Sequence, residues 1–259
     1  MGHKAWQAGA TFSMKTALYG RIVFGGSAVL FGAICLMWHD ADTWQSLHRI
    51  LRLPLGGIIG EVLMVALIAG GIGILFPRAL RGASIVLGAV YAIFSLVCVA
   101  GIVAAPRVFD QYDGFFEQVS LLSGALALCA VTTANAARSA TLRLLVRIGL
   151  GLSTVCFTLA QIIYFGVTAS LVPKWIPPNQ SFWAILTTIA FALAAVAILT
   201  NIRARLAMRL MALMLVVFGV LVWIPALVAH PQAHGNWSEF ALNFLIAGAT
   251  WMVADAQSG

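Results

Sequence analysis

The stretch FWAILTTIAFALAAVAILT at residues 182–200 decides the fold class, because it contains no charged residue. A helix needs about 20 mostly apolar residues to cross the hydrocarbon core of a bilayer. The stretch is too long for a typical strand, and it lacks the alternation of apolar and polar residues that membrane β-barrels show. It is therefore predicted to be a transmembrane helix.

Seven other stretches share this composition, which gives eight predicted spans. Their ranges are 18–38, 56–76, 82–104, 115–136, 146–170, 182–200, 206–228 and 239–255. Of the 259 residues, 62% are hydrophobic and 9% are charged, whereas soluble domains carry about 25% charged residues. So few charged groups cannot cover a water-soluble globule, and lipid must contact most of the surface. The sequence thus predicts an all-α, polytopic membrane protein embedded in a lipid bilayer.

The 15 lysines and arginines are divided unevenly between the two sides of this predicted topology. The N-terminus and the even-numbered loops contain Lys4, Lys15, Arg21, Arg78, Arg81, Arg138, Arg143, Arg147, Arg203, Arg205 and Arg209, and the opposite side contains Arg49, Arg52, Arg107 and Lys174. Basic residues concentrate on the cytoplasmic side, so both termini are predicted to be cytoplasmic, in a bacterial-type inner membrane. No basic patch with interleaved aromatic residues indicates a nucleic-acid partner.

The two halves of the chain resemble each other. Arg21-Ile22 with Gly25 and Phe31 parallels Arg147-Ile148 with Gly151 and Phe157, Ile74-Leu75 parallels Ile198-Leu199, Phe94 parallels Phe218, and Phe115-x-Glu117 parallels Trp237-x-Glu239. We predict two four-helix bundles in a parallel tandem repeat, with residues 18–136 as the first module, 137–145 as a cytoplasmic linker and 146–255 as the second module. Two modules with an even number of spans insert the same way up, related by a pseudo-twofold axis along the membrane normal. Chance similarity between apolar segments is the alternative.

The second half carries two stretches that resemble a known family. They are Leu171-Val-Pro-Lys-Trp-Ile-Pro-Pro178 followed by Phe182-Trp183, and Val228-Ala-His-Pro-Gln232 followed by Trp237-Ser-Glu239 and Asn243. These are similar to the first and last outer loops of the DoxX-like family of four-helix membrane proteins. The resemblance covers residues 147–255 and is weaker in the first half, where Ala105-Pro106 replaces the His-Pro pair. Some members are linked to thiosulfate:quinone oxidoreduction and others to membrane redox complexes, so the resemblance implies the fold firmly and a redox function only loosely.

Glu61 lies several residues inside the second predicted span, after Gly56-Gly57. An ionisable group at this depth is costly unless it is paired, protonated or hydrated. Glu61 is therefore either a functional carboxyl group that exchanges protons with a quinone, or an interfacial carboxylate that reaches water. Arg49 and Arg52 are its nearest candidate partners along the chain.

The acidic and aromatic residues gather at the predicted outer side. Apart from Asp255, this side holds every acidic residue, namely Asp40, Asp42, Glu61, Asp110, Asp113, Glu117 and Glu239. Trp183 and Trp237 lie there too. One interpretation is an aromatic belt with solvated loops, and the other is a polar and aromatic cavity that opens to the outer face.

Glu239 and Asn243 are one turn apart on one predicted helix face, where they could line a ligand site together with His230. Glu117 and Glu239 equally fit the first turn of a helix, where an acid complements the helix dipole. Pro231 separates His230 from His234, which opposes a helical pair of ligands, and no metal site is predicted. The ligand-binding candidates are Glu61, Glu239, Asn243, His230, Trp183 and Trp237.

Three hypotheses for the function remain open. The sequence has no histidine at mid-membrane depth for a haem and no nucleotide-binding or HExxH motif, so no intrinsic cofactor is predicted. The first hypothesis is a DoxX-like membrane subunit that binds quinone or another apolar ligand near the outer face and serves a redox partner protein. The second is a structural or assembly subunit of a larger membrane complex, and the third is a small-molecule transporter. The sequence leaves open whether the protein is an enzyme.

Overall fold

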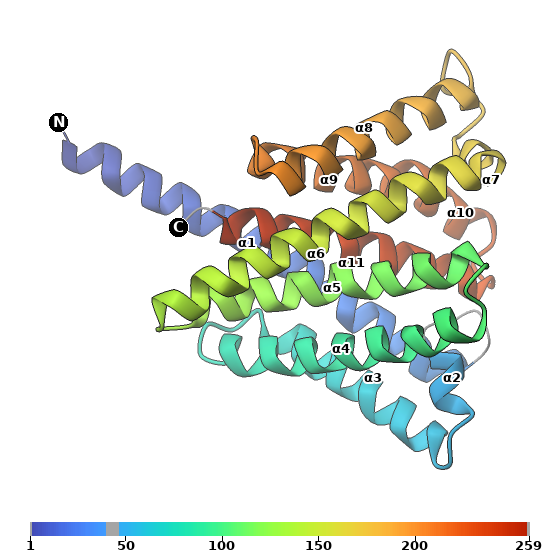
Figure 1. The fold of residues 1–259 in the computed structure, drawn as a ribbon, viewed down its shortest axis with the longest axis horizontal. Helices are drawn as coiled ribbons and strands as arrows, with labels where there is room; N and C mark the ends of the chain where they lie inside the picture. The colour runs from blue at the N-terminus through green and yellow to red at the C-terminus, as the bar shows by residue number, and fades with distance from the viewer. Residues whose placement is uncertain (1, 40–46, 258–259) are drawn as a thin grey trace.

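The structure is a computed structural model that describes residues 2–39 and 47–257, with the helical backbone alone for residues 2–17 (Figure 1). Asp40 and Asp42, two of the predicted outer acids, lie outside the described residues. Within the described ranges the regular structure is entirely helical and no strand occurs. The predicted all-α class is confirmed.

Eight long helical segments and three short helices make up the described chain. The long segments are α1 (Gly2–Trp38), α3 (Gly56–Gly73), α4 (Leu80–Ala104), α5 (Phe109–Thr132), α6 (Ala136–Ile163), α8 (Gln180–Thr200), α9 (Ala204–Phe218) and α11 (His234–Ala256). The short helices are α2 (His48–Leu51), α7 (Phe165–Leu171) and α10 (Ile224–Ala229), and a π-helical segment, η2 (Gly219–Trp223), joins α9 to α10.

Seven of the described helical segments are long and apolar enough to cross a membrane. They are 18–38 of α1, then α3, α4, α5, α6 and α8, and finally 204–229, which combines α9, η2 and α10. The protein is therefore a multi-pass membrane protein. The eighth predicted span corresponds to α11, which carries Glu239, Asn243 and Asp255, and twelve of its 23 residues are buried. A helix surrounded by protein in this way needs less apolar side-chain surface than one that faces lipid.

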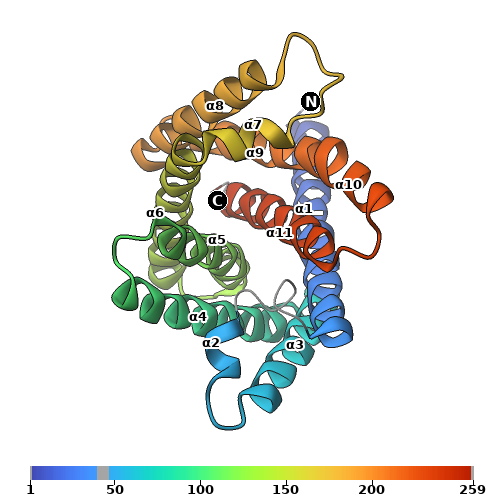
Figure 2. The ribbon, with the colours of Figure 1, turned by 90° about the vertical axis from the view of Figure 1, so that its right-hand side faces the viewer.

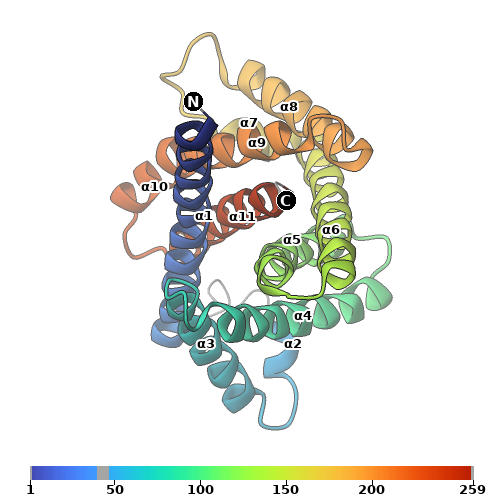
Figure 3. The ribbon, with the colours of Figure 1, turned by 90° about the vertical axis from the view of Figure 1, so that its left-hand side faces the viewer.

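The long helices form a ring in which each packs on its neighbours along the chain (Figures 2 and 3). The ring is closed by α1 against α11, and α5 and α11 also pack on each other across its middle. This central pair divides the ring into an α3–α4 half, completed by α1, and an α8–α9 half, completed by α6. The first helix of each predicted module thus packs on the last helix of the other, through the pairs α1·α11 and α6·α5.

The connections between the described helices alternate between the two ends of the ring. The loops α3–α4, α5–α6 and α8–α9 lie at the end where both chain termini lie, and α2, α7 and α10 lie at the opposite end (Figure 1). The first end, called the basic end below, holds Arg78, Arg138 and Arg203. The opposite end, called the acidic end, holds Asp110 and the start of α11.

Two predicted boundaries differ from the structure, and a third predicted span is irregular inside. Residues 137–145, predicted as a linker, form the first turns of α6, and the connection before it is residues 133–135. The predicted span 146–170 is interrupted at Tyr164, where α6 ends before α7. The predicted span 206–228 contains η2, which lies directly before Pro225 at the start of α10. Proline has no N–H to donate to the preceding turn, so a widened turn at this point has a local cause.

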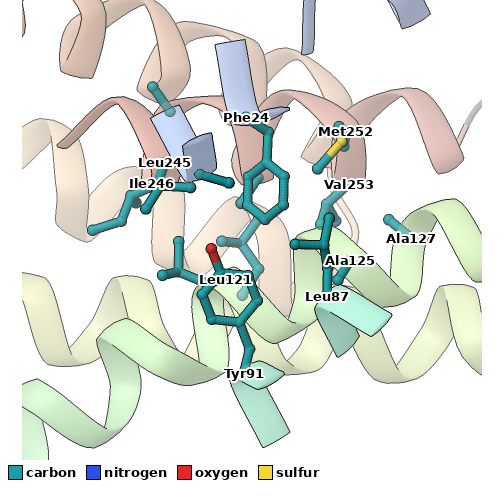
Figure 4. Close-up of a cluster of buried hydrophobic side chains, with 14 of the residues drawn as sticks. Phe24, Leu87, Tyr91, Leu121, Ala125, Ala127, Leu245, Ile246, Met252 and Val253 are labelled. Atoms are coloured by element: carbon teal, nitrogen blue, oxygen red, sulfur yellow. The ribbon is translucent and has the colours of Figure 1, made fainter. Parts of the chain in front are cut away.

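Aromatic side chains fill the α3–α4 half of the ring. Tyr91 of α4 is 2% exposed, and its ring lies 5.8 Å from that of Phe24 of α1 and 6.3 Å from that of Phe94. Leu121 of α5 and Leu245 of α11 close the cluster from the central helix pair (Figure 4). Dense packing of this kind leaves little room for a ligand on this side of the protein.

Candidate functional site

A cavity of about 710 Å³ lies in the α8–α9 half, between α5, α6, α8, α9, η2 and α11. Its apolar wall includes Phe157, Ala160, Phe191, Leu210, Met214 and Phe218. Its polar lining residues are Asp113, Glu117, Gln161, Thr168, Thr187, Glu239 and Asn243, and most of them lie toward the acidic end. The volume is that of a site for a small organic molecule.

Three carboxyl groups line the polar part of this cavity. Asp113 and Glu117 are four residues apart on α5, so they share one helix face. Glu239 of α11 faces them, and Glu117 lies within electrostatic range of both other groups. No lysine or arginine is among the described residues that line the cavity. Carboxyl groups gathered in apolar surroundings are costly unless protons, cations or hydrogen-bond donors accompany them, so this region favours a ligand that supplies such donors.

Gln161 of α6 is held in the cavity wall by two threonines of α8. Its Oε1 accepts hydrogen bonds from Thr188 Oγ1 at 2.8 Å and from Thr187 Oγ1 at 3.5 Å. Both hydroxyl groups also lie within hydrogen-bond distance of the Ala184 carbonyl oxygen, at 2.7 Å for Thr188 and 3.1 Å for Thr187, and each has a single proton to donate. The amide group of Gln161 supplies N–H donors at the cavity wall whichever acceptor takes that proton. The cavity therefore offers a neutral donor beside its carboxyl groups.

Asn243 of α11 forms a hydrogen bond with the neighbouring helix α9. Its Nδ2 donates to the Leu215 carbonyl oxygen at 2.8 Å, one turn before η2 begins. Gly219 lets α11 approach at this level, because a Cβ atom there would overlap the ring of Phe244. Asn243 and Gly219 together fix the position of η2, whose Leu221, Val222 and Trp223 line the cavity.

The two predicted tryptophans have the same hydrogen bond but different positions. Trp183 Nε1 donates to the Pro177 carbonyl oxygen at 2.8 Å, and Trp237 Nε1 donates to the Pro231 carbonyl oxygen at 3.0 Å. Each bond ties the start of a long helix to the loop before it. Trp183 lines the cavity, and Trp237 is not among the lining residues.

Glu61 and His230 lie away from the cavity. Glu61 is on α3, in the other half of the ring, with its side chain 57% exposed. Its Oε1 is 3.9 Å from His39 Nε2, and its candidate partner Arg49 donates instead to Gln111 Oε1 at 2.9 Å. His230 is exposed at the end of α10. The structure thus brings together Trp183, Glu239 and Asn243 of the six predicted candidates.

Other lining residues were not among the predicted candidates. The spacing of Asp113 and Glu117 places them on one helix face, and this was a signal that the sequence offered. Trp223 and Phe191 carried no such signal, because aromatic residues within apolar spans are common and their spacing does not distinguish lining from packing.

Within the described residues, no group of three or more histidine, cysteine, aspartate or glutamate side chains is arranged to hold a metal ion. Comparison of the chain with family models, curated proteins and solved structures found no match. The resemblance to the DoxX-like family stays a prediction from the loop sequences.

Proposed function

We propose that this protein binds an apolar small molecule from the membrane in the cavity of the α8–α9 half. The observation that carries the proposal is a cavity of about 710 Å³ whose wall is apolar and whose few polar groups gather at one end. A polar head can meet Glu117, Glu239 and Gln161 there while the rest of the molecule stays among apolar side chains. Sites for small organic ligands have this composition.

A quinone is the ligand that fits both this arrangement and the resemblance to the DoxX-like family. A quinone ring can pack on Trp183, and its carbonyl oxygens can accept from the Gln161 amide group. In the reduced form, the hydroxyl groups can donate to the carboxyl groups of Glu117 and Glu239. In this proposal the chain is a membrane subunit that holds the carrier near the outer face, and a partner protein supplies the redox centre.

The proposed architecture has eight spans, with α11 as the eighth, in two parallel modules. Arg21 and Arg147 support this, because Arg21 Nε donates to the Ile74 carbonyl oxygen at 2.9 Å and Arg147 donates to the Ile198 carbonyl oxygen at 3.1 Å. Arg21 and Arg147 thus each bind a carbonyl group at the end of the next long helix of the same module. By the positive-inside rule, this end faces the cytoplasm.

The loops of the acidic end also support a repeat, but they favour a different alignment of the two modules at this end. Tyr112 Oη donates to the Pro106 carbonyl oxygen at 3.0 Å, as Trp237 Nε1 does to that of Pro231. These bonds favour aligning Tyr112, rather than Phe115, with Trp237. When Phe94 is aligned with Phe218, Leu215 of the second module takes the position of Tyr91 in the first. The smaller leucine side chain lines the cavity, whereas the tyrosine ring fills the corresponding space in the first module.

The proposal is tested by titrating a decyl-tailed benzoquinone into the purified protein in nanodiscs. Ala160→Trp fills the cavity from α6 and Glu239→Gln removes one carboxyl group, and each is expected to weaken binding at least tenfold. Glu61→Gln, which changes a carboxyl group outside the cavity, is the matched control and is expected to leave binding unchanged. If Glu61→Gln weakened binding as much as Glu239→Gln, the cavity would not be the site.

A transporter is the second candidate, and η2 favours it. A π-helical turn beside a binding cavity is a common feature of functional sites, and Gly219 and Pro225 flank a segment that can change its winding. Flux of the bound molecule into proteoliposomes, abolished by Ala160→Trp, would support transport. Binding without flux would support the carrier-holding subunit instead.

A further inference from the structure

A second hollow lies between α8 and α9, nearer the basic end, with a volume of about 310 Å³. Its lining includes Leu193, Ala197, Leu206 and Ala207, and Arg203 at its far end. Except for Arg203, every lining residue is apolar. We call this hollow the α8–α9 groove.

The groove continues the main cavity. Ala190 of α8 and Leu210 and Met214 of α9 line both hollows. The combined path begins at the carboxyl groups of the acidic end and follows the seam between α8 and α9. From Trp183 to Ala197 the helix advances about 21 Å, at about 1.5 Å per residue, which is more than half of a hydrocarbon core of about 30 Å.

The seam faces the surroundings of the protein along this path. Leu186 and Leu210, which line the main cavity, are exposed side chains, and Leu193 and Leu206 of the groove are exposed as well. Among the seven apolar spans, those formed by α8 and by 204–229 are the least buried. A molecule dissolved in the bilayer can therefore reach the cavity sideways, and part of it can remain in the seam.

The distribution of polar groups gives this path a direction. Glu117, Glu239 and Gln161 lie only at its acidic end, and the wall beyond Ala190 is apolar as far as Arg203. A ring without a tail fills the main cavity and leaves the α8–α9 groove empty. A molecule with a polar head and a long hydrocarbon tail occupies both.

We infer that the ligand of the cavity is a long-tailed amphiphile whose hydrocarbon tail lies in the α8–α9 groove. The inference rests on the proposed function, because the head of the same molecule occupies the main cavity. Moving a tail from lipid to an apolar groove gains no hydrophobic free energy, so selectivity comes from the fit of the tail between the helices. The groove therefore discriminates by tail length and shape, and the cavity by the head.

The test compares a decyl-tailed benzoquinone with the tail-free quinone of the same head, each titrated into nanodiscs of one lipid composition. Ala197→Trp narrows the groove from α8, and Leu206→Trp narrows it from α9 at an exposed position. Val196→Trp places the same side chain on the neighbouring lipid-facing position, which does not line the groove. Comparing variants at one lipid composition cancels the partitioning of the probes into the membrane.

Ala197→Trp and Leu206→Trp are each expected to weaken binding of the decyl-tailed probe about tenfold and to leave binding of the tail-free probe unchanged. The control variant Val196→Trp is expected to bind both probes as the unaltered protein does. Equal effects on both probes, or no effect on either, would overturn the tail path while the cavity proposal stands. If neither probe bound the unaltered protein, the quinone site and the tail path would both be rejected. Size-exclusion profiles identify a misfolded variant. If one of the two groove variants misfolds, the other, on the opposite helix of the groove, tests the tail path.

A photoreactive diazirine at the end of the decyl tail gives a second readout. Crosslinks are expected within residues 190–214 and should disappear when the unlabelled decyl probe competes. Crosslinks that persist under competition would show that the probe labels the helices from the surrounding lipid without occupying a saturable site. Crosslinks confined to α10 would show that the tail extends toward the acidic end instead of along the α8–α9 groove. Either result would contradict the inference.

Discussion

Gly124 of α5 and Ala249 of α11 contact each other where the two central helices cross. A Cβ atom on Gly124 would lie 2.6 Å from the Cβ of Ala249 and 2.7 Å from its Cα. Under the proposed repeat, with Tyr112 aligned to Trp237, these two residues occupy equivalent positions in the two modules. The pseudo-twofold axis would then pass through their contact, and the small side chains permit the close approach of the helices.

Gly124→Val is therefore expected to separate α5 from α11 and to lower the stability of the protein by about 1–3 kcal/mol, the usual cost of overpacking. The obstacle is a backbone Cα atom, which cannot rotate away as a flexible side chain can. The midpoint of thermal unfolding in detergent measures the effect. Gly26→Val is the matched control, because nothing lies within 4 Å of a Cβ at Gly26. Equal midpoints for the two variants would contradict the central role of the crossing.

Arg21 and Arg147 give a second prediction, because each binds carbonyl groups at the end of the next long helix. The Arg21 guanidinium also reaches the Leu75 carbonyl oxygen at 3.1 Å. Arg21→Leu and Arg147→Leu are each expected to lower the unfolding free energy by roughly 1.5 kcal/mol, the lower end for hydrogen bonds to a charged group, because both side chains are half-buried. The measurement is unfolding in mixed micelles with increasing denaturing detergent.

The double variant Arg21→Leu/Arg147→Leu tests whether the two arginines form independent, equivalent contacts, as the proposed repeat requires, or belong to one network. Two equivalent but distant contacts should give effects that add within about 0.5 kcal/mol. Arg78→Leu, at an exposed position of the same end, should change stability little. A strongly non-additive double variant would show that the two arginines act on one element.

Tyr91 supplies a third prediction because its hydroxyl group is buried without a hydrogen-bond partner among the described residues (Figure 4). Tyr91→Phe removes that unsatisfied group and keeps the ring contacts, so stability is expected to stay equal or to rise by about 1 kcal/mol. Tyr91→Leu leaves a cavity and is expected to cost roughly 2–4 kcal/mol. Thermal unfolding of both variants checks the order, and a loss of stability in Tyr91→Phe would indicate a partner for the hydroxyl group.

The apolar runs predicted where the helices lie, but they could not predict which face each helix turns toward its neighbours. In a soluble protein the polar face of a helix marks the solvent side. In a membrane protein, lipid and protein interior are equally apolar, so this signal is weak. Glu61 is an example, because the sequence placed it inside the second span but left open whether its side chain lines a site or reaches water. In the structure this side chain is exposed and lies away from the cavity.

The candidate site was predictable where polar residues marked it and not elsewhere. Glu239 and Asn243 were predicted to share a face that lines a site, and both line the cavity. The apolar wall depends on how α6, α8 and α9 pack, and no pattern in those segments records it. The packing of α1 on α11 joins residues more than 200 positions apart, and local sequence carries no information on such a pairing.

The number of spans is decided by accessibility labelling of single cysteines in a variant without the four native ones. Cysteines at Arg78, Arg203 and Gln257 are expected to react from one side of the membrane, and cysteines at Arg107 and Lys174 from the other. Gln257 follows α11, so its side reports whether α11 crosses the bilayer. A Gln257 cysteine that reacted together with the Lys174 cysteine would leave seven spans, because α11 would then begin and end on the same side. That outcome would also reject the second module, since the carboxyl group of Glu239 and the amide group of Asn243 reach the cavity only if α11 stands upright between α5 and α9.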